Sequence, residues 1–125
     1  MEWDVEFTDE FGAWWNSLNI DEQEEVNAKV ELLEEHGPTL PRPHSDVIVT
    51  SKHANMKELR FTAHGGREVW RAAFAFDPDR SAIVLVAGDK QGKNQKLFYK
   101  WLIKIADRRF DSHLKRLAAE KITKR

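Results

Sequence analysis

The segment between residues 47 and 87 constrains the fold more than any other part of the chain. It holds three apolar runs with strand-like composition, at residues 56–62, 69–76 and 83–86, and a shorter one at residues 47–49. His64-Gly65-Gly66 and Asp77-Pro78-Asp79-Arg80 form turns between the longer runs. Strands joined in this way predict an antiparallel meander.

Helical patterns flank this segment on both sides. Thr8 is a typical N-cap for a first helix, and Asn19 or Asp21 begins a second helix that ends at His36-Gly37. Residues 3–7 alternate between apolar and acidic side chains, as a half-buried strand does, and residues 94–117 carry apolar rows at helical spacing. We therefore predict an α+β fold and a single domain over residues 1–125. Its N-terminal strand and two helices pack on an antiparallel meander sheet, with a C-terminal helix.

The composition excludes several classes of protein. The chain has no cysteine, which removes disulfides, thiolate catalysis and every metal site that depends on sulfur ligands. Its five histidines form no compact metal-binding pattern, so we expect no metal and no other cofactor. No apolar run approaches the roughly 18 residues of a membrane helix, and the acidic N-terminus does not resemble a secretory signal. We expect a cytoplasmic protein that does not enter membranes.

The charge is divided unevenly along the chain. Residues 1–35 contain twelve acidic and one basic residue, a net charge of −11, whereas the remainder contains nine acidic and nineteen basic residues, or +10. This asymmetry favours a basic surface that binds a polyanion, with an acidic face elsewhere that keeps the domain soluble. A surface of mixed charge with no ligand is the alternative interpretation.

The loop at residues 88–93, Gly-Asp-Lys-Gln-Gly-Lys, follows a predicted strand and precedes a predicted helix. It has three residues between the glycines and Asn94 after the lysine, whereas the phosphate-binding loop of nucleotide triphosphatases has four residues there and a Ser or Thr. We therefore interpret it as a strand-to-helix turn. Lys90 and Lys93 could still receive a phosphate near the start of the helix.

Basic residues within the predicted sheet are the main candidates for a site. In an extended strand, Glu58 and Arg60 point to one face and Lys57 to the other. Arg71 lies inside the most apolar strand, and arginine is rarely buried without a partner. Two interpretations remain open: Arg71 forms a structural ion pair with Glu58 or Glu68, or it binds a phosphate from the concave face of the sheet.

A row of basic side chains follows one face of the C-terminal helix at i,i+4 spacing. Its members are Lys96, Lys100, Lys104 and Arg108. Like charges at this spacing destabilise a helix by a few tenths of a kcal/mol per pair. Neither Lys96 nor Lys100 has an acidic residue three or four positions away to offset this repulsion. The row is therefore a candidate surface for an anionic partner.

Three segments carry a recognisable pattern: SKHANMKELR at residues 51–60, WRAAFAFDP at 70–78 and VLVAGDK at 84–90. Together with the order of elements, they resemble the RelE/ParE toxin superfamily, and most of all its HigB branch, which includes phage-derived Gp49-like members. The resemblance covers about residues 3–115. Many members carry a tyrosine near the position of Tyr99, although Phe98 lies equally close to it.

The resemblance implies a RelE-like fold and the toxin of a bacterial type II toxin–antitoxin system. Such toxins cleave messenger RNA, usually on the ribosome, and are held inactive by a cognate antitoxin with a helix-turn-helix domain. Operator DNA would be contacted only through that antitoxin. Cleavage by the neighbouring 2′-hydroxyl requires a stabilised phosphorane and proton transfers but no metal ion.

Positions that match the family's catalytic residues are Lys57, Arg60, Arg71 and Lys90. We assign Arg60 and Arg71 to the phosphate and Lys57 to electrostatic support or proton transfer. Lys90 is assigned to the phosphate or to the leaving oxygen. The predicted RNA-binding residues are Arg67, Lys93, Lys96 and Lys100.

Two other functions are compatible with the same resemblance. A ParE-like toxin shares the architecture but inhibits DNA gyrase, and it has no need of a cluster of phosphate ligands on the sheet. A non-enzymatic module that binds nucleic acid or protein could also use this fold, because the sequence contains no obvious His–carboxylate pair. The fold alone does not decide among the three functions.

Overall fold

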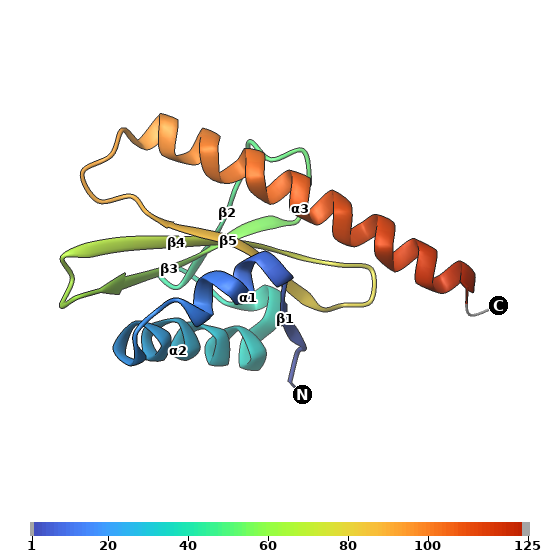
Figure 1. Cartoon of the computed structure of the whole chain (residues 1–125), viewed down its shortest axis with the longest axis horizontal. Coiled ribbons are helices and arrows are strands. Elements are labelled where there is room, and N and C mark those ends of the chain that lie inside the picture. The colour runs from blue at the N-terminus through green and yellow to red at the C-terminus, as the bar shows by residue number, and fades with distance from the viewer. Residues whose placement is uncertain (1, 124–125) are drawn as a thin grey trace.

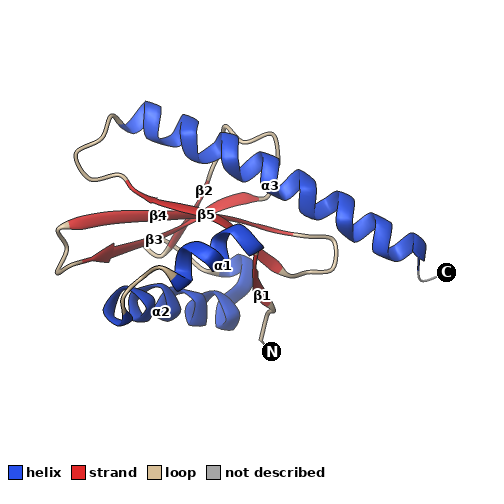
Figure 2. Ribbon diagram, in the orientation of Figure 1, coloured by secondary structure: helices blue, strands red, loops and turns tan. Residues whose placement is uncertain are grey.

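The computed structural model describes residues 2–123 and contains a five-stranded sheet with the strand order β1-β5-β4-β3-β2 (Figures 1 and 2). The strands are β1 (Val5–Phe7), β2 (Ser45–Val47), β3 (Met56–Ala63), β4 (Glu68–Phe76) and β5 (Ala82–Asp89). Strands β2 to β5 pair with their neighbours in antiparallel order. The predicted α+β class and the antiparallel meander are therefore confirmed.

The structure corrects two details of the predicted sheet. The N-terminal strand β1 pairs in parallel with β5, so the sheet is mixed. The strand expected at residues 47–49 begins earlier, at Ser45, and ends at Val47. Its polar member Asp46 lies opposite Glu58 and accepts hydrogen bonds from Arg42 and Arg60, which explains why an edge strand carries an acidic residue here.

Three α-helices cover the two faces of the sheet. Helices α1 (Asp9–Asn16) and α2 (Ile20–His36) lie on one face, and α3 (Gln95–Thr123) crosses the other (Figure 1). Helix α3 extends beyond residue 117, where the sequence predicted its end. No helix among residues 2–123 combines the length and the apolar character needed to cross a membrane.

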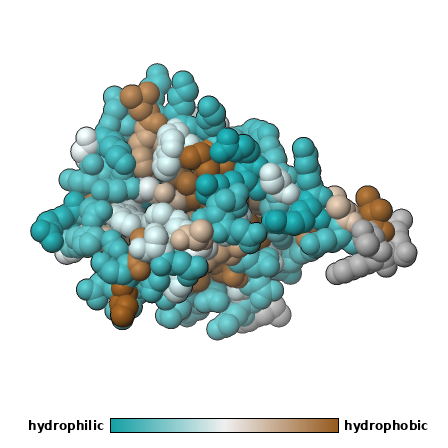
Figure 3. Space-filling view, viewed as in Figure 1, coloured by the Kyte–Doolittle hydropathy of each residue, from teal (hydrophilic) through white to brown (hydrophobic). Residues whose placement is uncertain are grey.

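Each face of the sheet has its own hydrophobic core. Phe11 and Leu33 pack with Phe74 beneath α1 and α2, while Leu102 and Phe110 of α3 pack with other residues of the sheet on the opposite face. All five of these side chains are buried. The view in Figure 3 shows a largely hydrophilic surface on which apolar side chains form small separate groups. The apolar periodicity of the helices is thus used to cover both sides of one sheet.

The helix starts were correctly predicted by their capping residues. The Thr8 hydroxyl accepts a hydrogen bond from the backbone N–H of Phe11 at 3.1 Å. Asn19 and Glu22 form a reciprocal capping box, with distances of 2.9 and 2.8 Å. These contacts satisfy backbone donors that the first helical turn leaves unpaired, and they separate α1 from α2 by a short, fixed turn.

Gly37 ends α2 in a backbone conformation that favours glycine. Its φ is +57°, and the residue is buried where the chain enters a 3-10 helix, η1 (Gly37–Thr39). A Cβ at this position would lie only 2.4 Å from the indole Nε1 of Trp3. Gly12, in the middle of α1, has no heavy atom within 4 Å of the corresponding Cβ position.

We predict that Gly37→Ala lowers the free energy of unfolding by about 2 kcal/mol, because alanine is strained at positive φ and its Cβ displaces Trp3. Urea denaturation followed by tryptophan fluorescence measures the change. The matched control, Gly12→Ala, should leave stability unchanged or raise it by about 0.5–1 kcal/mol, since alanine is the better helix former. Equal effects of the two substitutions would contradict this account.

Candidate active site

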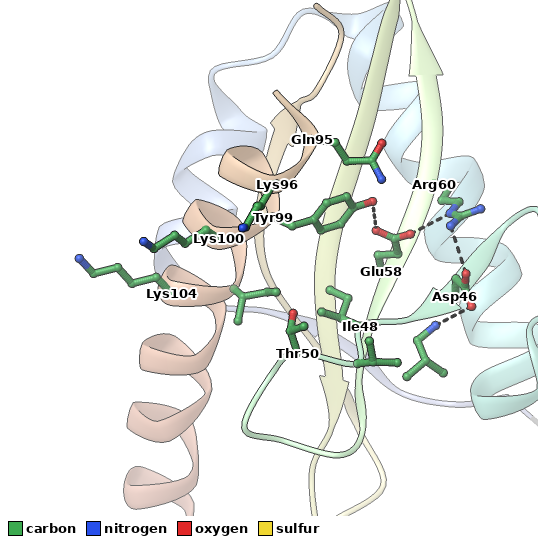
Figure 4. Close-up of a pocket in the computed structure, with 13 residues that line it drawn as sticks. Asp46, Ile48, Thr50, Glu58, Arg60, Gln95, Lys96, Tyr99, Lys100 and Lys104 are labelled. Carbon is green, nitrogen blue, oxygen red and sulfur yellow. Dashed lines mark hydrogen bonds and ion pairs between the residues drawn. The ribbon is translucent and has the colours of Figure 1, made fainter. Parts of the chain in front are cut away.

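A groove of about 980 Å³ lies between α3 and the β2–β3 edge of the sheet (Figure 4). Residues from β3 and from the first three turns of α3 line it. The residues that line the groove are Asp46, Val47, Ile48, Val49, Thr50, Glu58, Arg60, Gln95, Lys96, Tyr99, Lys100, Ile103 and Lys104. It therefore combines one arginine predicted to be catalytic with two lysines predicted to bind RNA.

Glu58 is the buried centre of the polar side of this groove. Its side chain is 4% exposed. The Tyr99 hydroxyl donates a hydrogen bond to Oε1 at 2.6 Å, and Arg60 Nε donates one to Oε2 at 2.8 Å (Figure 4). Arg71 Nε lies 3.9 Å from Oε1. One carboxylate thus holds a tyrosine of α3 and two arginines of neighbouring strands.

Strand register explains why the arginines gather on one face. Arg60 of β3 lies directly opposite Arg71 of β4, which lies opposite Gly88 of β5, and directly paired residues share a face of the sheet. Gly88 gives α3 room above this row, because a Cβ there would lie 2.8 Å from the ring of Trp101. The small residue therefore lets the helix and its Tyr99 approach the arginines.

The structure places Arg71 near Glu58 rather than Glu68. Glu68 is engaged elsewhere, with His64 and with the indole N–H of Trp70. Arg71 Nη1 donates a hydrogen bond to the Trp70 carbonyl, while its Nε is buried and forms no hydrogen bond among the described residues. The distance of 3.9 Å between Arg71 Nε and Glu58 Oε1 is too long for a hydrogen bond. Arg71 therefore keeps an N–H donor and a positive charge that a ligand can use.

Lys90 extends this cationic row beyond the end of β5. Its backbone N–H donates to the Val69 carbonyl at 2.8 Å, which ties the loop to β4. Burial lowers the pKa of the Lys90 ammonium, and the nearby Arg71 guanidinium lowers it further. A lysine shifted in this direction gives up its proton more readily than an exposed one.

Lys57 is separated from the other predicted catalytic residues. Its Nζ donates a hydrogen bond to the Pro38 carbonyl at 2.9 Å, at the end of α2. The side chain therefore points to the α1–α2 face, as the alternation along β3 requires, whereas Glu58 and Arg60 point to the α3 face. The structure brings together Arg60, Arg71 and Lys90 but not Lys57.

The predicted RNA-binding residues also divide into two groups. Lys96 and Lys100 line the groove, as the sequence pattern suggested, together with Lys104. Arg67 lies in the β3–β4 turn, where its Nε donates to the His64 carbonyl. Lys93 lies over the Phe98 ring, beside a separate cavity that Leu97 and Trp101 also line. Only the α3 lysines among the four line the groove itself.

Sequence reasoning left the roles of Tyr99 and Glu58 undecided. Tyr99 faces the groove and Phe98 is buried in the core, which answers the question that their adjacency raised. Burial raises the pKa of Tyr99 to about 12, with a further contribution from its hydrogen bond to Glu58. The alternation along β3 predicted that Glu58 and Arg60 share one face of the sheet. It did not predict that Tyr99 of α3 would donate a hydrogen bond to Glu58.

Comparisons with known proteins agree with this architecture. A family model of phage-derived Gp49-like proteins matches residues 13–111. The candidate toxin HigB2 of Mycobacterium tuberculosis is 48% identical over 102 residues, which cover 82% of this chain and 50% of HigB2. The candidate toxin HigB3 of the same organism is 46% identical over 101 residues, covering 81% and 84% of the two chains. This chain therefore spans about half the length of HigB2.

A solved structure shares the fold at low sequence identity. It is a double arginine-to-alanine mutant of the Escherichia coli toxin RelE in its free state. The TM-score is 0.55 and the identity 12%, with 87% of this chain and 98% of that chain covered. The predicted RelE-like fold is confirmed by this match.

Tyr99 is the only tyrosine in the sequence, so the absorbance of its phenol reports on the surroundings of this side chain in the groove. We predict that tyrosinate absorbance of the folded protein titrates near pH 12, the raised pKa of Tyr99. In the unfolded chain the phenol has its ordinary pKa of 10. The stability that this group contributes is therefore fully present below pH 10 and is lost as the pH rises toward 12.

Glu58→Gln should move the Tyr99 pKa down from about 12, while burial, the larger cause, keeps it above 10. Glu31→Gln, on the exposed surface of α2, should leave the titration unchanged. Circular dichroism at each pH confirms that the chain remains folded. A tyrosine that titrates near pH 10 in the folded wild-type protein would show that the hydroxyl is not held in the groove.

Proposed function

This chain belongs to the family of phage-derived Gp49-like proteins, and from that membership we propose that it is the toxin of a bacterial type II toxin–antitoxin system, a metal-independent endoribonuclease that cleaves messenger RNA. Two relatives at 46% and 48% identity carry toxin names, and the fold is that of RelE. The observation that carries the proposal is the cationic cluster of Arg60, Arg71 and Lys90 beside the lysine-lined groove.

The cluster suits a phosphodiester in charge and geometry. Arg60 and Arg71 lie side by side on paired strands and share the single carboxylate of Glu58. Asp46 also pairs with Arg60, but Arg42 competes for the same carboxylate oxygen. The site therefore keeps excess positive charge, and guanidinium groups fixed in this way stabilise the charge of a phosphorane as it develops.

Proton transfer to the leaving group is the second task that the cluster can perform. The 2′-hydroxyl gives up its proton to solvent as its oxygen attacks phosphorus, the bond from phosphorus to the 5′-oxygen breaks, and the 5′-oxygen must gain a proton. Lys90 is the cation whose pKa is lowered by burial and by Arg71, so we assign it as the donor. Glu58 and Tyr99 are assigned as positioning residues, since both are engaged in holding the arginines and α3 in place.

We propose that the lysine row binds the phosphate backbone of the RNA next to the cationic cluster. Lys96, Lys100 and Lys104 follow one another along α3 at the border of the groove, and in Figure 4 the side chains of Lys100 and Lys104 extend away from Glu58 and Arg60. Cations at this spacing neutralise successive phosphates of a single strand without reading its sequence. We propose that the strand is a message in the ribosomal A site and that the protein acts in the cytoplasm.

A cognate antitoxin with a helix-turn-helix domain is the proposed inhibitor. The toxin would reach operator DNA only through this partner.

The first 35 residues carry a net charge of −11, and they build β1, α1 and most of α2. This acidic side lies on the face of the sheet opposite α3, away from the groove, so RNA binding and the acidic surface do not interfere.

The catalytic assignment is tested by Arg71→Ala. Brief induction of the wild type in a bacterial host should arrest growth and produce new RNA 5′ ends within translated codons, and Arg71→Ala should reduce these ends by a factor of 100 or more, of the order expected for loss of a preorganised charge. Arg80→Ala is the matched control, because Arg80 lies over the ring of Trp3 at the opposite end of the sheet.

Each other outcome of this experiment points to a different function. Full cleavage by folded Arg71→Ala would remove Arg71 from the site. Growth arrest with an SOS response and no new RNA ends would favour gyrase inhibition. The absence of any phenotype in the wild type would favour a non-enzymatic binding module.

The lysine row is tested by the Lys96→Ala, Lys100→Ala double variant. Binding to an RNA oligonucleotide with 2′-deoxy sugars at the cleavage positions should weaken, and the slope of log K against log salt should fall by about 1.4, or 0.7 for each lost phosphate contact. Lys115→Ala with Arg116→Ala removes the same charge from an exposed part of α3 remote from the groove. Equal slopes for the two double variants would show that the row does not bind RNA.

A further inference from the structure

Outside the groove, Glu22, His64 and Glu68 bring metal-ligating atoms together at the tip of the β3–β4 hairpin; we call these residues the His64 cluster. Glu22 lies in the first turn of α2, His64 in the hairpin turn, and Glu68 at the start of β4. His64 Nε2 lies 2.8 Å from Oε2 of Glu22 and 2.8 Å from Oε2 of Glu68. All three ligand atoms lie within 4.8 Å of one another.

Two carboxylates converge on a single ring nitrogen, an arrangement that a metal ion between the three groups would satisfy. Nε2 carries either one lone pair or one proton, so it cannot donate a linear hydrogen bond to both oxygens. Ligand atoms that each lie about 2.0–2.1 Å from a metal ion are roughly 3.0–3.4 Å apart. The two observed distances reach this range after shifts of a few tenths of an ångström, which side-chain rotation provides.

Both carboxylates are oriented by hydrogen bonds through their other oxygen. Glu22 Oε1 accepts the backbone N–H of Asn19 at 2.9 Å, and Glu68 Oε1 accepts the indole N–H of Trp70 at 3.3 Å. Each Oε2 is thereby left facing His64. Partners of this kind, which fix a ligand without touching the metal, are a regular feature of metal sites.

The surroundings of the cluster provide space and negative charge. A cavity of about 300 Å³ adjoins Glu22 and His64, and it is also lined by Asp21, Glu24 and Glu25. Water molecules in this space could complete the coordination shell of an ion held by three side chains. His64 has a φ of 55°, a left-handed turn conformation that fixes where its ring projects.

We propose that the His64 cluster binds a divalent first-row transition metal, with Zn²⁺ as the best match for one imidazole and two carboxylates. The ion would join the N-terminus of α2 to the β3–β4 hairpin. Sequence analysis predicted no metal because the ligands do not form a compact pattern, with Glu22 lying 42 residues before His64. This site is on the α1–α2 side of the hairpin, and the proposal is independent of RNA cleavage.

Calorimetric titration of the full chain with Zn²⁺, after treatment with a chelator, tests the proposal. We expect one site per chain and an increase of about 5 °C or more in the unfolding temperature at saturation. Mg²⁺ should bind far more weakly, because it does not favour imidazole.

Variants assign the binding to the cluster. His64→Ala should abolish the site, whereas His36→Ala should retain it, because His36 lies at the far end of α2 with only Glu35 near its ring, at 4.0 Å, among the ion pairs of residues 2–123. Glu68→Gln keeps an acceptor for Trp70 but removes the charge, and it should weaken Zn²⁺ binding at least tenfold.

Three results would overturn the proposal. They are the absence of Zn²⁺ binding by the wild type, equal binding by folded His64→Ala, and equal binding by Glu68→Gln. The first result would leave the cluster as a structural contact between His64 and two carboxylates. Glu68→Gln keeps the proposal testable should His64→Ala fail to fold, since it preserves the backbone turn and the contact with Trp70.

Discussion

The arrangement of the groove depends on burial of the Glu58 carboxylate. A carboxylate that loses its water must be compensated by hydrogen bonds and opposite charge, since the cost of leaving it unpaired is several kcal/mol. Arg60 supplies one hydrogen bond from the same strand and Tyr99 supplies another from α3. Arg71 adds charge from β4 at 3.9 Å. Satisfying one buried group therefore fixes the relative positions of two strands and a helix.

This compensation is possible because α3 approaches the sheet closely. Gly88 has no side chain to hold Trp101 away, and the first turns of α3 settle over the row that also contains Arg60 and Arg71. The same turns carry Lys96 and Lys100, whose mutual repulsion is a small local cost to the helix. Packing of one apolar face thus orients both the tyrosine that completes the Glu58 contacts and the lysines that face the groove.

Local signals in the sequence predicted most of the fold. The capping residues Thr8 and Asn19 act on the nearest helical turn, and the alternation along β3 depends only on neighbouring residues, so both could be recognised without tertiary information. The parallel pairing of β1 with β5 joins segments about 75 residues apart, and no local pattern specifies it. The same limit applied to the early start of β2, whose register depends on Glu58 and Arg60.

The alternation of residues along a strand predicted only which side chains of that strand lie on the same face of the sheet. Residue type and family resemblance predicted Arg60 and Arg71 as phosphate ligands, and the structure places them opposite each other on paired strands. Lys57 entered the same predicted set, although the alternation along its strand assigned it to the other face. The contact of Tyr99 with Glu58 spans 41 residues and two types of element, so it required the packing of α3 to be known.

Contacts along the β3–β4 hairpin connect the His64 cluster with the cationic cluster of Arg60, Arg71 and Lys90. Glu68 accepts the indole N–H of Trp70, the Trp70 ring packs in the core beneath α1, and the Trp70 carbonyl accepts Nη1 of Arg71. Because successive residues of β4 alternate between the two faces of the sheet, Glu68 of the His64 cluster and Arg71 of the cationic cluster point to opposite faces. Trp70 and Arg71, neighbours in β4, thus belong to the core on one face of the sheet and to the cationic cluster on the other.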